Sequence, residues 1–414
     1  MRIQKLTLRN FRNVRDASFE PSPYLNFLVG KNGQGKTSFL EAIGYLATLR
    51  SFRGSKTQEV IRWDSQDAEV VCKLGLDSSD KEKWETLLKV SFTMTDSTRS
   101  RATKVAFIND KPYRSSTQYL SQRFGNFVLG FHSVVFNPSD HDLVRSDPAT
   151  RRSYLDRVIA AEDVEYLKGL QRYQKVLDQR NAVLKNNERP LPELLSGFTE
   201  GLIHYGAQIT YKRIQWIHRL EKILNNTMRQ IAQNQPPLQL VYVSNWVPKM
   251  ADLSKINDNL SAVHFAGHGA PPSLELLEHA LRKKQVSLEA AEWKSGHSLV
   301  GPHRDDWTFL MGGQVLKGHG SQGEVRSALL ALKLSEIELF RETTGHRPVF
   351  LLDDFSSELD QERRTFLLDF LSERDLQVFV TTTDEGLFPN KVREHSQRSY
   401  KRFWVTNGEL KSDG

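Results

Sequence analysis

The segment Gly30–Thr37 constrains the fold of this chain more than any other, because its spacing is that of a phosphate-binding loop. It matches the pattern G-x-x-x-x-G-K-[ST] without a mismatch. The apolar run 25–29 predicts a buried strand before the loop, and the apolar spacing within 38–49 predicts a helix after it. We therefore expect an α/β fold of the P-loop class, with the loop between that strand and that helix.

The residue types in this loop suit the binding of a nucleotide. Glycines supply backbone torsions that a Cβ would penalise, so successive N–H groups converge on phosphate oxygens, and the following helix N-terminus adds partial positive charge. Lys36 is predicted to reach the β and γ phosphates of ATP, and the Thr37 hydroxyl to bind Mg²⁺. The predicted nucleotide-binding residues of the loop are Gly30, Lys31, Asn32, Gly33, Gln34, Gly35, Lys36 and Thr37.

A second apolar run, 348–352, ends in two carboxylates, Asp353 and Asp354. Open α/β sheets bind ligands at the carboxyl ends of buried parallel strands. We expect Asp353 to hold Mg²⁺ together with Thr37, and Asp354 to orient or deprotonate the attacking water, so these two acids are the predicted catalytic residues. Without the phosphate loop this would be weak evidence, because any strand that leaves a core can end in acids.

The order of the later elements is that of ABC-type ATPase heads, which kinases and GTPases with the same phosphate loop lack. Residues 321–324 read Ser-Gln-Gly-Glu and open a predicted helix, 324–342, while 357–360 read Ser-Glu-Leu-Asp after the paired acids. In such heads the signature of one copy closes over the γ-phosphate bound to the other, and a serine hydroxyl at a helix N-terminus is a suitable donor. Ser321 and Gly323 are thus predicted ATP-binding residues, and ATP is expected to join a homodimer that hydrolysis releases.

The remaining patterns divide the chain into three parts. Residues 1–140 contain the phosphate loop and a predicted β-meander between 69 and 108, 141–295 form a predicted helical lobe, and 296–414 complete the ATPase head. Asp147 and Pro148 predict a helix start, and the helical patterns carry no long heptad array. Elements expected elsewhere are a first strand at 3–8 with a polar turn at 9–13, helices at 149–186, 191–233 and 273–293, a strand at 238–246 and a hairpin at 312–313.

Composition bears on partners and location. Lys and Arg outnumber Asp and Glu by 57 to 50, and the formal charge of +7 favours a polyanionic partner such as DNA. The single cysteine, Cys72, excludes a disulfide framework, and the N-terminus shows neither a signal peptide nor a membrane span, so we expect a cytoplasmic protein without a membrane partner. Candidate DNA contacts, each individually an ordinary surface residue as well, are Arg50, Arg53, Lys56, Arg62, Lys168, Arg172, Lys175, Arg180 and Lys185.

Over nearly its whole length, the sequence resembles the RecF family of bacterial DNA replication and repair proteins, which are SMC-like ATPases of the ABC type. Besides the loop, the resemblance rests on 6–13, on the Arg-Arg-x-x-Leu-Asp pattern within 147–156, on Gly-Pro-His-Arg-Asp-Asp at 301–306, and on 351–360. It implies an ABC-type, SMC-like head with an inserted helical lobe and no long coiled coil. Two departures from the usual ABC pattern are the aspartate at 354, where most ABC ATPases have glutamate, and Ser-Gln-Gly-Glu in place of Ser-Gly-Gly-Gln.

The resemblance also implies a function. It implies ATP-dependent dimerisation on single-stranded DNA and on gapped or junction DNA, with slow, DNA-stimulated ATP hydrolysis that serves as a switch. It further implies cooperation with RecO and RecR type mediators to load the RecA recombinase at gaps, with SOS induction as a consequence. By its match to SMC-like heads, Arg12 is expected to reach the nucleotide, although a solvated turn explains this arginine equally well.

Several alternatives remain open at this stage. A transporter-type ABC motor would carry a short helical subdomain, whereas 141–295 is long enough for a separate lobe, and a defence nuclease would need an appended domain with a carboxylate cluster. Asn137 occupies either the glutamine-loop position or a helix-entry turn. The stretch 301–306 lacks metal-ligand spacing, which favours a structural or interface role. Arg151 and Arg152 in a first helical turn indicate an anionic partner or a solvated face.

Overall fold

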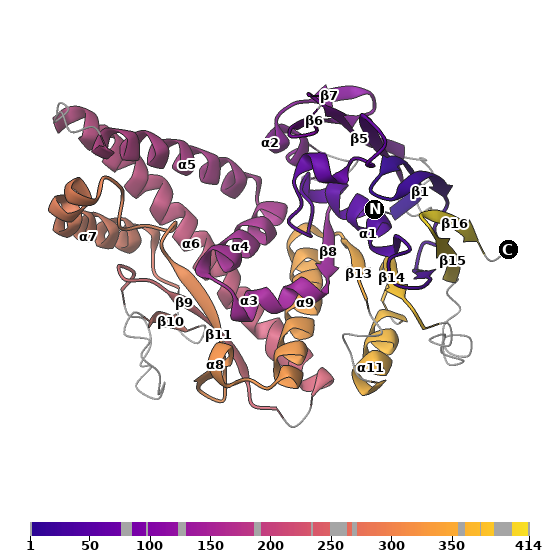
Figure 1. Cartoon of the computed structure of the whole chain (residues 1–414). Helices are drawn as coiled ribbons and strands as arrows, with labels where there is room; N and C mark the ends of the chain where they lie inside the picture. The colour runs from indigo at the N-terminus through magenta and orange to yellow at the C-terminus, as the bar shows by residue number, and fades with distance from the viewer. Residues whose placement is uncertain are drawn as a thin grey trace. The chain divides into compact units, whose positions relative to one another are not determined.

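The computed structural model describes residues 2–75, 85–96, 98–122, 130–185, 192–232, 235–248, 263–266, 271–354, 361–372, 374–384 and 400–412. The chain forms two compact units, of which unit 1 is Met1–Asp140 with Glu336–Gly414 and unit 2 is His141–Ser335 (Figure 1). Unit 2 begins at the residue where the helical lobe was predicted to begin. It extends to Ser335 and therefore includes residues 296–335, which were predicted to belong to the ATPase head. The reason is strand β11 (Asp306–Met311), which pairs with β9 (Leu238–Val243) inside unit 2.

Unit 1 contains a six-stranded, mostly parallel sheet with the strand order β16-β15-β3-β14-β13-β8. Every residue of β3, β8, β13 and β14 is buried, the pattern of parallel strands that are covered on both faces. The apolar runs 25–29 and 348–352, each predicted to be a buried strand, are confirmed as strands β3 and β13 of this one sheet, with β14 between them. The strands are β3 (Leu25–Val29), β8 (Ser133–Phe136), β13 (Val349–Leu352), β14 (Val378–Thr382), β15 (Tyr400–Thr406) and the antiparallel β16 (Glu409–Ser412).

A second, antiparallel sheet of unit 1 has the order β2-β1-β4-β5-β6-β7, so the expected meander is part of a larger sheet. The predicted first strand was too short: β1 continues beyond Leu8 because Phe11 is fully buried and pairs with Val14, which leaves Arg12 and Asn13 as the turn. The strands are β1 (Arg2–Phe11), β2 (Val14–Phe19), β4 (Asp67–Gly75), β5 (Glu85–Met94), β6 (Ala102–Ile108) and β7 (Lys111–Tyr113).

Helix α1 (Lys36–Thr48) joins the two sheets of unit 1 into one core. It packs against β1 and β5 of the antiparallel sheet and against β8, β13 and β14 of the parallel sheet. Its predicted apolar residues, among them Phe39 and Ile43, are fully buried in this core. The shorter elements of unit 1 are η1 (Thr57–Val60), α2 (Ser116–Leu120), η2 (Pro138–His141, which runs into unit 2) and α11 (Gln361–Ser372).

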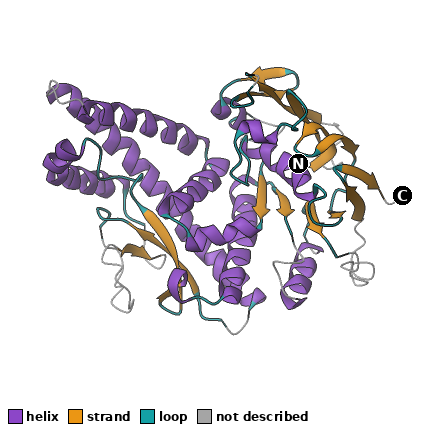
Figure 2. Ribbon diagram, in the orientation of Figure 1, coloured by secondary structure: helices purple, strands orange, loops and turns teal. Residues whose placement is uncertain are grey.

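Unit 2 is a helical lobe with a small sheet of order β10-β9-β11-β12 (Figure 2). Its longest described helix, α6 (Pro192–Ile231), packs against α5, α7 and β9, and thus belongs to a compact lobe rather than to a long coiled coil. The other elements are α3 (Asp142–Arg145), α4 (Pro148–Glu162), α5 (Val164–Lys185), α7 (Leu274–Ser295), β10 (Val263–Ala266), β12 (Gln314–Val315) and α8 (Leu316–His319).

The helix expected over 149–186 is in fact two helices, α4 and α5, that meet at Asp163. One carboxylate oxygen of Asp163 accepts hydrogen bonds from the backbone N–H groups of Glu165 and Tyr166, both at 3.0 Å, so it caps the start of α5. The predicted start of α4, with Asp147 before Pro148, is confirmed, although the Asp147 side chain makes no capping hydrogen bond.

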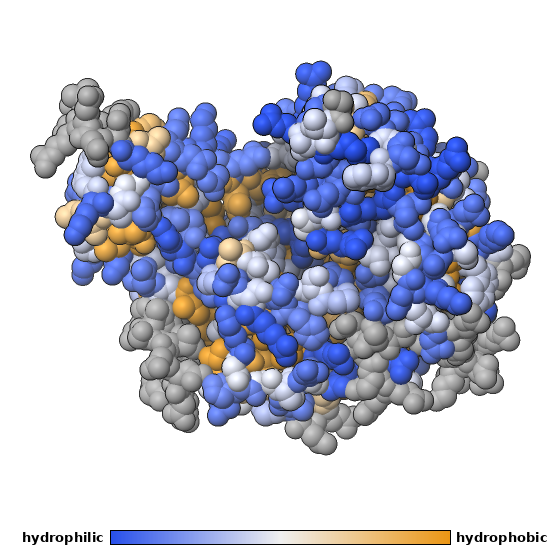
Figure 3. Space-filling model, viewed as in Figure 1, coloured by the Kyte–Doolittle hydropathy of each residue, from blue (hydrophilic) through white to orange (hydrophobic). Residues whose placement is uncertain are grey.

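Later elements also agree with the sequence. Gly312 and Gly313 take left-handed torsions, φ 59° and 81°, in the turn of the β11–β12 hairpin, and α9 (Gln322–Thr344) covers the expected helix. The Ser-Glu-Leu-Asp stretch at 357–360 lies outside the described residues. Hydrophilic residues cover most of the face seen in Figure 3. Among the helices that are described, none combines the length and apolarity that crossing a membrane requires.

Candidate nucleotide-binding site

The carboxyl ends of the parallel strands in unit 1 open into a cleft of about 1180 Å³. Strand β14 lies between β3 and β13, and the register sets Val29 beside Thr382 and Leu352 beside Val380. The phosphate loop after β3 and the paired acids after β13 therefore reach the same edge of the sheet. The residues that line the cleft include Arg12, Asn13, Asn32, Gly33, Gly35, Lys36, Thr37, Arg62, Trp63, Arg99, Asn137, Asp353, Asp354 and Thr381.

The glycines of the loop have two different physical roles. Gly33 and Gly35 take left-handed torsions, φ 78° and 105°, as the loop spacing predicts. Gly30 instead satisfies a requirement for space, because a Cβ there would lie 2.3 Å from the backbone oxygen of Val405 in β15. The expectation of a special torsion at Gly30 was therefore wrong, and the close passage of the neighbouring strand explains this glycine.

The backbone of the phosphate loop holds the Lys36 side chain. Its Nζ donates hydrogen bonds to the backbone oxygens of Gly30 at 2.7 Å and Lys31 at 2.9 Å. Burial lowers the pKa of Lys36, and the negative charges of Asp354 and Asp353 oppose that shift. The ammonium group is thus held by the loop and faces the acids across the cleft.

Asp353 brings together the residues predicted to bind metal. Its Oδ1 accepts hydrogen bonds from the hydroxyls of Thr37 and Thr381, each at 2.8 Å. Burial raises the pKa of Asp353, and the two hydroxyl donors act in the opposite direction. A carboxylate beside a threonine hydroxyl offers the oxygen ligands that Mg²⁺ prefers, so this pair fits the ion.

Asp354 lines the cleft next to Asp353, and Thr381 connects the two acids. The backbone N–H of Asp354 donates to the Thr381 hydroxyl at 2.8 Å, and Asp354 has a left-handed backbone, φ 53°. The sequence alone assigned no role to Thr381. Its role depends on β14 lying beside β13, which no local pattern reveals.

Arg12 lines the cleft, and its guanidinium is held by a buried acid, while its predicted contact with the nucleotide stays a prediction. Its Nε and Nη2 donate to the two carboxylate oxygens of Glu41 at 2.9 and 2.6 Å, and Nη1 donates to the backbone oxygen of Glu59 at 2.7 Å. The Glu41 side chain is fully buried. This bidentate pair fixes the β1–β2 turn against α1.

Two groups that sequence reasoning missed support the loop from behind. The Asn13 side chain donates to the backbone oxygen of Gln34 at 3.1 Å and accepts from the Ser38 hydroxyl at 3.0 Å. The backbone N–H of Asn407 donates to the Gln34 side chain at 2.7 Å, and that of Gly408 donates to the Gln34 backbone oxygen at 2.8 Å. Gln34 thus anchors the loop to the turn between β15 and β16. The Asn-Gly pair signals a turn in the sequence, but not where that turn lies.

Asn137 forms the helix-entry turn that was one of its two predicted roles, and the glutamine-loop role stays a prediction. Its side-chain oxygen accepts from the N–H of Ser139 at 2.8 Å, and its own N–H donates to the Asp140 carboxylate at 2.8 Å. These bonds turn the chain from β8 into η2. The same residue also lines the cleft.

Ser321 and Gly323 lie in unit 2, at the start of α9. The Ser321 hydroxyl accepts from the N–H of Glu324 at 3.2 Å, and the Glu324 carboxylate accepts from the N–H of Ser321 at 2.8 Å. This reciprocal pair is a capping box, which gives a physical reason for glutamate at the fourth position of the signature.

The two most family-specific stretches contact each other inside unit 2. Arg151 forms a bidentate ion pair with Asp306, at 2.8 and 2.7 Å, and Arg152 donates to the backbone oxygen of Asp305 at 2.9 Å. The anionic partner suggested for these arginines is thus the 301–306 stretch itself. Within the part of the chain that is described, no group of three or more His, Cys, Asp or Glu side chains is arranged to hold a metal ion.

Asp305 and His303 sit in the interior of this network. Asp305 accepts from the Tyr242 hydroxyl at 2.8 Å and from the Trp246 indole at 3.0 Å, and burial raises its pKa to about 6. The His303 ring contacts the Tyr173 hydroxyl at 2.6 Å, and burial lowers its pKa to about 4. The structural role expected for 301–306 matches these contacts.

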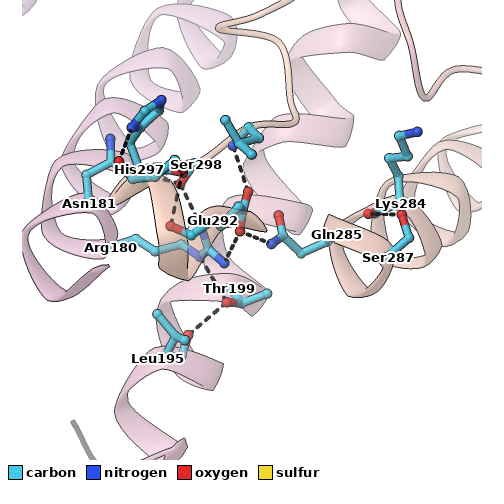
Figure 4. A network of polar contacts seen from close by, with 12 residues as sticks. Arg180, Asn181, Leu195, Thr199, Lys284, Gln285, Ser287, Glu292, His297 and Ser298 are labelled. Carbon is cyan, nitrogen blue, oxygen red and sulfur yellow. Dashed lines mark hydrogen bonds and ion pairs between the residues drawn. The ribbon is translucent and has the colours of Figure 1, made fainter. Parts of the chain in front are cut away.

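One candidate DNA contact is excluded by its burial. Arg180 is 1% exposed, and its guanidinium bonds to Glu292, Thr199 and Ser298 (Figure 4). The expectation of a surface charge was wrong because α6 and α7 cover this side of α5. Arg62 is partly buried, and the exposed candidates are Arg50, Arg53, Lys56, Lys168, Arg172, Lys175 and Lys185.

Comparison of the sequence with known proteins finds one family. Residues 2–404 match the family model described as the RecF/RecN/SMC N terminal domain. A DNA replication and repair protein RecF from Geotalea uraniireducens is 34% identical over 412 residues, which cover 99% of this chain and 100% of the relative.

Solved structures are also similar. The recombination mediator protein RecF with ATP, in the RecFOR pathway, has a TM-score of 0.79 at 29% identity, with 100% of this chain and 98% of that chain covered. An Smc head domain from Pyrococcus furiosus, bound to the C-terminal domain of ScpA, shares the fold with a TM-score of 0.53 at 14% identity, covering 99% and 95% of the two chains.

Proposed function

Because this chain belongs to the RecF family, within the RecF/RecN/SMC N-terminal domain family, we propose that it is an ATP-dependent DNA-binding protein of recombinational repair and replication. The observation that carries the proposal is the hydrogen bond of 2.8 Å between the Thr37 hydroxyl and Asp353, in the cleft that Lys36 also lines. This arrangement of side chains suits a magnesium nucleotide. Burying polar groups costs free energy, and the packing of the fold alone gives no reason to gather them here.

In this proposal the phosphates of ATP lie in the loop 30–37, with Lys36 as their cationic partner. Thr37 and Asp353 hold Mg²⁺, which supplies charge neutralisation at the phosphates. Asp354 orients or deprotonates the attacking water, from its position beside Asp353 in the cleft. Hydrolysis is slow, and ATP acts mainly as a switch.

The switch works through dimerisation. Ser321 and Gly323 of one copy contact the γ-phosphate bound to a second copy, and the exposed Ser321 at the start of α9 suits this contact. The ATP-bound homodimer binds single-stranded DNA and gapped or junction DNA. It cooperates with RecO and RecR type mediators to load a recombinase at gaps, which supports SOS induction.

The light-scattering mass of the purified protein, with and without Mg-ATP and with and without a gapped DNA oligonucleotide, tests this proposal. We expect the mass to double with Mg-ATP, and DNA to bind the doubled species more tightly. Lys36→Ala should abolish both effects, whereas Lys283→Ala, at an exposed position of α7, should leave both unchanged. A mass that is indifferent to ATP would exclude the dimer switch for this chain.

A further inference from the structure

The cleft contains an exposed aromatic side chain that phosphate and metal binding do not use. Trp63 lines the same cleft as the phosphate loop and is 84% exposed. Large apolar side chains are usually at least partly covered, and an exposed indole in a ligand cleft requires an explanation. Trp63 is therefore the strongest unexplained feature of the site.

Arg99 orients the Trp63 ring. Its guanidinium carbon lies 5.4 Å from the ring centroid, within the range of a cation–π contact. The same guanidinium donates to the backbone oxygens of Ser65 at 2.6 Å and Arg62 at 3.0 Å, so it also fixes the turn that carries Trp63. One face of the indole is thus held, and the high exposure of the residue leaves the other face available.

The turn that carries Trp63 is joined to the support of the phosphate loop. The backbone N–H of Arg62 donates to the backbone oxygen of Asn10 at 2.8 Å. The side-chain Nη1 of Arg62 donates to the backbone oxygen of Asn13 at 3.0 Å. Asn13 in turn bonds to Gln34 and Ser38 of the loop region. The turn that carries Trp63 and the phosphate loop are therefore connected by one chain of hydrogen bonds.

We propose that the free face of Trp63 stacks on the purine base of the nucleotide whose phosphates occupy the loop 30–37. This inference rests on the proposed function, because it assigns the base end of the same ligand. The Arg99 guanidinium covers one face of the flat indole, so a planar base can stack on the opposite face. Because the ring already has a partner, stacking costs little further side-chain entropy. The cleft is large enough for a nucleotide in addition to its phosphates.

Binding of ATP and of inorganic tripolyphosphate, each with Mg²⁺ and measured by calorimetry, tests the inference because only ATP carries a base. Trp63→Ala should weaken ATP binding about tenfold, the scale of stacking on an aromatic ring, and leave the tripolyphosphate affinity unchanged. Trp63→Phe should retain most of the ATP affinity. Leu276→Ala removes an exposed apolar side chain outside the cleft and should change neither.

Arg99→Ala tests the positioning role. We expect it to weaken ATP binding less than Trp63→Ala does, again without an effect on tripolyphosphate, since Arg99 acts through the ring.

The outcomes separate the two proposals. Equal ATP affinities of the wild type and Trp63→Ala would overturn the stacking inference alone. Loss of tripolyphosphate binding together with ATP binding in Trp63→Ala would also overturn it, because the residue would then support the fold of the cleft. Failure of the wild-type protein to bind either ligand would overturn the proposed function and this inference with it.

Discussion

At the scale of single residues, the left-handed backbone of Asp354 gives a physical reason for its short side chain. Aspartate and asparagine adopt φ near +53° more readily than longer side chains do, because their polar groups can bond locally. A glutamate here, as in most ABC ATPases, would meet a larger backbone penalty. Asp354→Asn should therefore remove the charge without disturbing the turn after β13.

We predict that Asp354→Asn still binds ATP but hydrolyses it at least about a hundredfold more slowly, since a general base contributes on that scale. The dimer should then persist with ATP, as measured by single-turnover phosphate release and light scattering. Asp110→Asn is a matched control, because Asp110 is an exposed aspartate with φ 66° in the turn between β6 and β7. An Asp354→Asn protein that stays monomeric at saturating ATP would contradict the mechanism.

Asp305 and His303 should give unit 2 two opposing pH dependences. With a folded pKa of about 6, Asp305 keeps a proton that the unfolded chain releases near pH 4, so its contribution to stability falls as pH rises from 4 to 6. With a folded pKa of about 4, His303 is neutral where the unfolded chain is protonated, so its contribution rises from pH 4 to 6.5.

Single substitutions should expose each dependence. Relative to the wild type, Asp305→Asn should make the slope of stability against pH more positive by up to about 1.4 kcal/mol per unit, and His303→Gln should make it more negative by a similar amount. Urea unfolding midpoints at three pH values between 4.5 and 6.5 measure both slopes. Identical slopes for the two variants would refute the assignment.

At the scale of elements, the sequence predicts those parts of the site that lie next to each other in the chain. The strand, loop and helix around Lys36 and the acids after β13 were foreseeable because apolar periodicity and loop spacing are local signals. The contacts of Thr381 with Asp353, and of Asn407 with Gln34, join residues from different strands, and no local pattern encodes which strands become neighbours. The break at Asp163 was missed because the apolar periodicity continues through it.

The buried network around Arg180 should be essential to the packing of α5, α6 and α7 (Figure 4). Arg180→Ala leaves the fully buried Glu292 carboxylate without its cation, which should cost about 3–5 kcal/mol of unfolding free energy. The exposed pair between Arg282 and Glu200 also joins α7 to α6, so Arg282→Ala is a matched control that should cost about 1 kcal/mol or less. Urea unfolding measures both, and equal losses would contradict the role given to the buried pair.

At the scale of the whole molecule, composition and length predict a chain of more than one domain, but they do not predict the domain boundary at Ser335. That boundary depends on β11 pairing with β9, an association of segments far apart in the chain. The start of the lobe near residue 141 was foreseeable, because the apolar run before it ends at a sequence break followed by helical patterns.

At a net charge of +7, the proposed DNA binding should weaken as the salt concentration rises. If the exposed cations contact phosphates, the logarithm of DNA affinity should fall linearly with the logarithm of salt concentration, with a slope of about −0.7 for each phosphate contact with single strands. Fluorescence anisotropy of a labelled gapped oligonucleotide between 50 and 200 mM salt, at saturating ATP, measures this slope. Affinity that does not change with salt would exclude phosphate contacts as its main source.

The turn at Asn407 and Gly408 has a consequence for the order of synthesis. It supports the phosphate loop through Gln34, a residue 373 positions earlier in the chain. A ribosome therefore makes the loop long before it makes the segment that steadies it. The nascent chain carries a complete nucleotide-binding sequence without its final support, and a product truncated before β15 would lack both that support and the strand that passes Gly30. We therefore expect the phosphate loop to reach its supported conformation only after the segment through Gly408 has been made and has folded onto it.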